Sequence, residues 1–309
     1  MCSVTLLLAV CVLDVIVAES ADDAQFAVGS IQLGLCALPT MWTFARRSDL
    51  VKECLACLVA AAEAIEPHAD AEAQGHVRAA VRADRMRVSV YLLAATTPLI
   101  ILTDVKVRSE SRWLQAAVLL WTGYSYVAMC FAYYTLMLLA FVANSSLAQL
   151  YRVVGRGVES GRCRRRWAAM QGRLLRVSLV MDAFLPGLLP FVMVGSVILP
   201  AFSTASVLAD PARADLMSVV AMPDLWFVFV PLCESGASLS AARGRVAECA
   251  YRGPWLEEPP HRRPPAWGSW ASTLVLDRHA LLGVLKSWFS YVQAMSSMRR
   301  RQGLQGWQG

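Results

Sequence analysis

The last apolar stretch of the chain contains residues that could line an aqueous path. We expect one helix over residues 273–298, and the polar or ionisable residues embedded in it are Asp277, Arg278, His279, Lys286 and Gln293. A charged side chain costs roughly 2.5–3.5 kcal/mol at the centre of a bilayer, so such residues usually face protein or water. The stretch is therefore predicted to line a pore rather than to face lipid.

Two sets of side chains recur in this helix at spacings of three and four residues, which places each set on one face. An ion path needs polar groups that replace part of the hydration shell and an apolar constriction that closes by dewetting. The predicted pore residues are Lys286, Phe289, Ser290, Val292, Gln293 and Met295. The alternative is that these residues only pack against neighbouring helices. Because Lys286 is unfavourable in a cation path, we expect it to snorkel or to pair with Glu234.

The composition is that of a membrane protein. The chain has 309 residues, of which 57% are hydrophobic and 17% charged, with a mean hydropathy of +0.46. Soluble domains carry about 25% charged residues, and several apolar runs here approach the ~20 residues that cross a bilayer as a helix. We predict an all-α polytopic membrane protein, one transmembrane domain over 1–309, with a soluble helical protein as the alternative. The net charge of +6 arises from Arg residues between apolar runs, which disfavours nucleic-acid binding.

About seven spans are expected from the apolar runs. They cover residues 3–18, 24–45, 88–103, 113–143, 177–202, 216–239 and 273–298. The first could instead be a cleaved secretory signal, but no Lys or Arg precedes Arg46, so the positively charged n-region is missing. The fourth run, of ~31 residues, rises about 46 Å and should project beyond a ~30 Å hydrocarbon core.

Three polar segments, about 46–87, 144–176 and 241–272, are expected to be helical loops in the cytoplasm. They hold most of the 29 Lys and Arg residues, and positive charge resists translocation across the membrane. This distribution predicts a cytoplasmic N-terminus and an extracellular C-terminus. The second segment should be loosened by its glycines, Gly155, Gly157 and Gly161.

Metal and catalytic chemistry find little support in the sequence. The nine Cys residues lie mostly in apolar or cytoplasmic segments, which argues against a disulfide framework. Cys54 and Cys57 have the spacing of a zinc or redox site, but no second pair accompanies them. The four His residues are scattered, without a nucleophile at a recognisable spacing. We therefore expect no metal, no cofactor and no enzymatic activity.

Residues 246–255 carry the pattern Val-x-Glu-x-Ala-Tyr-x-x-x-Trp, which Leu276-Asp277 and an apolar, aromatic-rich helix follow. This pattern resembles the C-terminal signature of insect odorant receptors. The resemblance implies a seven-span, ligand-gated, non-selective cation channel in the plasma membrane. It implies that the last helix lines a pore at the centre of a tetramer, with a hydrophobic ring at Val292. It also implies a co-receptor subunit of the same fold as partner, and intracellular packing for Tyr251 and Trp255.

In that family the ligand lies among the outer halves of the second, third, fourth and sixth spans. The residues that these spans offer here are Phe26, Trp121, Tyr124, Trp226 and Phe227. An aromatic cluster fits a small volatile ligand, and the Tyr124 hydroxyl could donate a hydrogen bond to it. The alternative is that these rings form packing contacts or an interfacial belt.

The sequence departs from the family pattern after the signature, because the Pro-rich stretch 259–265 cannot form the regular helix that would join the cytoplasmic anchor. A G-protein-coupled chemoreceptor is one alternative function, although the third span ends in Thr103-Asp104-Val105 without Asp-Arg-Tyr. A small-molecule transporter is another, although the sequence has no internal repeat. We expect an odorant receptor that acts as an odorant-gated channel subunit.

Overall fold

A computed structural model describes the fold of most of the chain. The described residues are 1–17, 21–68, 74–75, 78–79, 82, 84–89, 112–159, 164–183, 185–188, 191, 194–209, 225–252, 282–283, 285–290 and 292–294. Every regular element within these ranges is helical. The prediction of an all-α chain is thus confirmed over the described residues.

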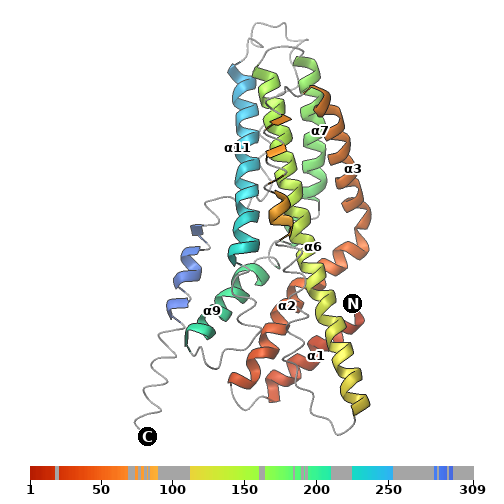
Figure 1. The fold of residues 1–309 in the computed structure, drawn as a ribbon, viewed down its shortest axis with the longest axis vertical. Helices are drawn as coiled ribbons and strands as arrows, with labels where there is room; N and C mark the ends of the chain where they lie inside the picture. The colour runs from red at the N-terminus through yellow and green to blue at the C-terminus, as the bar shows by residue number, and fades with distance from the viewer. Residues whose placement is uncertain are drawn as a thin grey trace.

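Seven α-helices and several short helical segments make up the described fold (Figure 1). The α-helices are α1 (Cys2–Val17), α2 (Ala21–Arg46), α3 (Ser48–Ile65), α6 (Arg112–Glu159), α7 (Arg164–Asp182), α9 (Leu199–Ala209) and α11 (Val230–Arg252). The short segments are the 3-10 helices η1 (Glu66–His68) and η3 (Pro186–Leu188), and the π-helices η4 (Val194–Ile198) and η5 (Leu225–Phe229).

Helix α6 is the longest element, and the other helices pack around it. Its 48 residues extend about 72 Å, more than twice the thickness of a ~30 Å hydrocarbon core. It contains the predicted fourth span and continues without interruption to Glu159. Figure 1 shows α11 beside the upper half of α6, with α7 and α3 on the other side and with α1 and α2 beside its lower half.

Two apolar cores lie along α6. The lower core joins α6 to α1 and α2, and its residues include Leu7, Cys36, Tyr126, Met137 and Val228. The upper core joins the second half of α6 to α3, α7 and α11, and its residues include Leu58, Tyr151, Trp167, Leu174 and Val246. Since α6 carries both cores, the two ends of the molecule are connected through one continuous helix.

The lower core also contains hydroxyl pairs between helices. Ser30 of α2 bonds the Tyr126 hydroxyl of α6, and Tyr133 of α6 bonds Ser196 of η4. Gly195 lets η4 approach closely, because a Cβ there would lie 2.8 Å from the Tyr133 ring. Small residues and hydroxyl groups at helix contacts are the means by which helices associate in lipid.

The basic segment 144–176 differs from our expectation about its glycines. Gly155 and Gly157 lie inside α6, whereas Gly161 lies outside the described residues. A Cβ on Gly157 would lie 2.1 Å from Cε2 of Trp167 in α7. Gly157 therefore permits close packing between α6 and α7 and does not loosen the segment.

The Pro-rich fifth predicted span is not one continuous α-helix. Its described residues are divided among the end of α7, η3, η4 and α9, and the described residues of the sixth predicted span run from η5 directly into α11. Pro186 begins η3, and Pro231 is the second residue of α11. Single π-helical turns such as η4 and η5 often occur at functional sites.

Two of the described helices are long and apolar enough to cross a bilayer. They are Trp113–Glu159, in which an 18-residue stretch has a mean hydropathy of 1.9, and Leu225–Cys249, in which such a stretch has 1.4. The segments Cys2–Val17 and Gly195–Ala205 are apolar but shorter. Buried helices of soluble proteins meet the same criteria of length and hydropathy, so the seven-span topology stays a prediction.

Candidate functional site

The predicted ligand residues lie on α2, α6 and η5. Trp121 of α6 is half-buried and packs against the lower core, to which Val228 of η5 also contributes. Tyr124 is 68% exposed, and Trp226 and Phe227 of η5 are also exposed. Phe26 lies in α2, and its side chain is outside the described part of the structure. The exposed rings are available to a ligand, to lipid or to another subunit, so their predicted role stays a prediction.

An aromatic contact joins η5 to the last helix. The rings of Trp226 and Trp288 meet edge to face, with centroids 6.2 Å apart and planes at 83°. Trp288 and Phe289 make a second edge-to-face contact at 4.9 Å. Such pairs contribute about 0.5–1.5 kcal/mol beyond the area that they bury. A predicted ligand residue is thus in direct contact with the predicted pore helix, through a residue that the sequence did not single out.

The last helix has one buried face and one exposed face. Residues 282–283, 285–290 and 292–294 are helical. Trp288 and Val292 are buried in a third apolar cluster, which also contains Ala201, Leu225, Phe229 and Cys233.

The exposed face carries most of the predicted pore residues. Lys286, Ser290 and Gln293 are exposed, and Phe289 is 58% exposed, against 8% for Val292. Phe289 and Val292 thus differ in exposure, because Val292 packs against the chain's own bundle, and their joint place at the pore stays a prediction. Met295 lies outside the described residues.

Two serine hydroxyls among the described residues of this helix donate to its own backbone. Ser290 Oγ donates to the Lys286 carbonyl at 2.9 Å, and Ser287 Oγ donates to the Gly283 carbonyl at 3.0 Å. These bonds to the preceding turn let serine lie in an apolar environment. The pairing of Lys286 with Glu234 is wrong, because Glu234 Oε2 lies 3.5 Å from Arg87 Nη2 and Lys286 is exposed.

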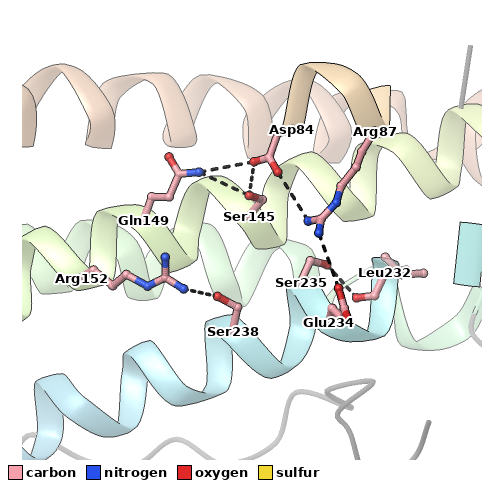
Figure 2. Close-up of polar contacts among 9 residues, drawn as sticks. All are labelled: Asp84, Arg87, Ser145, Gln149, Arg152, Leu232, Glu234, Ser235 and Ser238. Carbon is pink, nitrogen blue, oxygen red and sulfur yellow. Dashed lines mark hydrogen bonds and ion pairs between the residues drawn. The ribbon is translucent and has the colours of Figure 1, made fainter. Parts of the chain in front are cut away.

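Five residues form a polar junction that the sequence did not reveal. We call Asp84, Arg87, Ser145, Gln149 and Glu234 the Arg87 junction (Figure 2). Its residues come from the helical turn 84–89, from α6 and from α11. The sequence carried two signals, which were Glu234 inside the predicted sixth span and charged residues just before the predicted third span. Nothing in the sequence showed that these groups pair with one another.

The Cys54-x-x-Cys57 spacing does not create a reactive thiol pair. Cys54 is fully buried in the upper core, whereas Cys57 is half-buried. Burial raises the pKa of the Cys54 thiol to about 11, and its neighbour Cys57 adds to the shift. Because metal binding needs the thiolate, this burial disfavours Cys54 as a ligand. Among the described residues, no three His, Cys, Asp or Glu side chains are grouped to hold a metal ion.

No known protein family and no curated protein matches the sequence. Six chains of solved structures match the fold. One is the insect olfactory receptor OR5 from Machilis hrabei, with a TM-score of 0.56 and 8% sequence identity over 95% of this chain and 87% of that chain. The chain thus has the fold of an insect olfactory receptor, which is a polytopic membrane fold, and the predicted resemblance is confirmed at the level of the fold. In the signature, Tyr251 lies near the end of α11 and Trp255 lies outside the described residues.

Proposed function

We propose that the chain is a subunit of an odorant-gated, non-selective cation channel in the plasma membrane. The observation that supports this most is the agreement with the olfactory receptor OR5 of Machilis hrabei over 95% of the chain. The subunit has seven spans, a cytoplasmic N-terminus and an extracellular C-terminus, which accords with the placement of the Lys and Arg residues.

The ligand in this proposal is a small volatile molecule bound among the second, third, fourth and sixth spans. Trp121 and Tyr124 on α6, Trp226 and Phe227 on η5, and Phe26 on α2 are the residues that contact it. Aromatic rings suit an apolar ligand, and the exposed Tyr124 hydroxyl can donate a hydrogen bond. The π-helical turn η5 at the start of α11 supports this location, because such irregular turns often mark functional sites.

The exposed face of the last helix lines the pore and meets the neighbouring subunits. Lys286, Phe289, Ser290 and Gln293 lie on this face, while Val292 holds the helix against its own bundle. Met295 completes the predicted set. The assembly is a tetramer that includes a co-receptor subunit of the same fold, in which four last helices surround one axis.

Gating couples the ligand to the last helix through the contact between Trp226 and Trp288. A ligand that binds beside Trp226 shifts the balance between a closed and an open arrangement of the last helices. The size of the shift is limited by the difference in the ligand's affinity for the two states. A close aromatic contact is a direct physical route for that difference to reach the pore.

Voltage-clamp recording tests the proposed function. Cells express the chain alone or with a co-receptor subunit, and a panel of small volatile alcohols, esters and phenols is applied. A ligand-evoked cation current that survives block of G proteins is expected. A response that G-protein block abolishes, or ion-coupled uptake without unitary currents, would contradict the proposal in favour of a chemoreceptor or a transporter.

A further inference from the structure

The Arg87 junction connects three segments that lie far apart in the sequence. Asp84 accepts hydrogen bonds from Ser145 Oγ and, at 3.4 Å, from Gln149 Nε2, both on α6. Arg87, one turn further along its own helix, has Nη1 3.8 Å from Asp84 Oδ1 and Nη2 3.5 Å from Glu234 Oε2. Figure 2 shows the guanidinium between the two carboxylates.

The partners of Asp84 hold the turn 84–89 on α6. Gln149 is buried, and it also donates to Ser145 Oγ at 3.4 Å. The Arg87 guanidinium lies 5.7 Å from the centre of the Phe141 ring, also on α6. Because the guanidinium is planar and always charged, it can reach two carboxylates at once in a defined geometry. One side of the junction is therefore fixed, and the other side is the bond to Glu234 on α11.

A second polar contact lies one turn further along both long helices. Arg152 Nη2 of α6 donates to Ser238 Oγ of α11, as Figure 2 shows. The Arg87 junction and this contact therefore follow one another along α11 as it leads away from η5. Of the two α11 residues in these contacts, Glu234 lies nearer to η5 than Ser238 does.

Glu234 is close to the contact between η5 and the last helix. It lies eight positions after Trp226, which corresponds to about 12 Å along the helix axis. Trp226 meets Trp288, and the neighbouring Phe229 and Cys233 share the buried cluster of Val292. A change in the position of α11 at Glu234 therefore reaches the packing surface of the last helix within two turns.

We propose that Arg87 and Glu234 are positioning residues for gating. Their ion pair fixes the start of α11 relative to α6 and to the turn 84–89, and this sets the balance between two arrangements of η5 and the last helix. The proposal rests on the proposed function of the chain and adds to it a control point outside the ligand site and the pore. Both side chains are about half exposed, 42% for Arg87 and 48% for Glu234, so the pair contributes little to overall stability.

A double-mutant cycle on the accessibility of the last helix tests this proposal. Ser290→Cys is introduced into the parent chain and into Arg87→Gln, Glu234→Gln and the double variant. The rate at which a charged, water-soluble methanethiosulfonate modifies Cys at this position is measured by peptide mass spectrometry, in purified full-length protein in lipid nanodiscs. Arg85→Gln is the matched control, because Arg85 is exposed, lies on the same helical turn and carries the same charge.

Each single variant is expected to change the modification rate about fivefold in the same direction, which is the lower end of typical coupling between sites. The double variant should show the same fivefold change, because either substitution already breaks the pair. The Arg85→Gln control should leave the rate unchanged. If Arg87→Gln fails to fold, Arg87→Lys replaces it, since it keeps the charge but loses the fork that reaches both carboxylates.

The inference is overturned if the rates stay within twofold of the parent, or if the two single changes multiply in the double variant. It is also overturned if Arg85→Gln produces an equal change. Failure of the proposed function has a different signature: Cys at position 290 is then unreactive in every background, and cells that express the parent chain show no ligand-evoked current.

Discussion

Trp226 of η5 and Trp288 of the last helix pack edge to face, with ring centroids 6.2 Å apart. Trp226 is about half exposed, whereas Trp288 is buried. One ring of the pair is therefore available to a ligand while the other holds the last helix in place. This asymmetry makes the contact suited to carry a change at the surface of η5 into the packing of the last helix.

Trp288 should matter far more for stability than its neighbour Phe289. Trp288→Ala removes a buried ring from the third apolar cluster, which typically costs about 3–5 kcal/mol. Phe289→Ala removes an exposed ring and should cost less than about 1 kcal/mol. Thermal unfolding of the two purified variants measures the difference. Equal melting temperatures would show that Trp288 is not packed as the structure has it.

Gly157 should tolerate no side chain. In Gly157→Ala the added Cβ meets the buried ring of Trp167, and relief of such overlap typically costs about 1–3 kcal/mol. The matched control is Gly172→Ala in α7, where a Cβ has nothing within 4 Å. That change should stabilise the helix by up to about 1 kcal/mol. Thermal unfolding that ranks the two variants in the opposite order would refute the close packing of α6 on α7.

Cys54 should make stability depend on pH in the alkaline range. Burial raises the pKa of this thiol to about 11 in the folded chain, above the ~8.5 of an unfolded chain. The stability that the neutral, buried thiol contributes is fully present below its pKa in the unfolded chain. This stability is lost as pH rises towards its pKa in the folded chain, because over that range only the unfolded chain ionises.

Over that alkaline window the free energy of unfolding should fall by about 3 kcal/mol at most on account of Cys54. Cys54→Ala should remove this component, whereas Cys57→Ala should keep most of it, since burial is the larger cause of the shift and Cys57 the smaller. Unfolding curves at pH 8 and pH 10.5 check the prediction. If stability depended on pH in the same way in Cys54→Ala, the Cys54 thiol would have to be in contact with water in the folded chain.

The sequence predicted local features of the fold more successfully than contacts between distant segments. The long helix that contains 113–143 follows from its apolar run, and the interruption near Pro186 follows from the missing proline N–H. Both are properties of neighbouring residues. The aromatic signature of the C-terminal region led to the correct fold for a similar reason, because its residues are close together in the chain.

The contacts that the sequence missed depend on tertiary packing. Gly157 resembled a flexible loop residue, and only the ring of Trp167 on the next helix explains it. Lys286 was the cation expected to pair with Glu234, and the register between α11 and the turn 84–89 brings Arg87 to it instead. Val292 was assigned to a pore by its place in a motif, whereas the rotation of the helix that buries it is set by η5 and α9.

The central claim is that the exposed face of the last helix lines an aqueous path. Its most direct test is the block of cation current by a charged, water-soluble thiol reagent in the variants Ser290→Cys, Gln293→Cys and Val292→Cys. We predict that current through the Ser290→Cys and Gln293→Cys channels falls on treatment, and that Val292→Cys reacts more slowly because its side chain is buried. If Ser290→Cys and Gln293→Cys remain unmodified, with and without a ligand, the last helix does not line a conduction path.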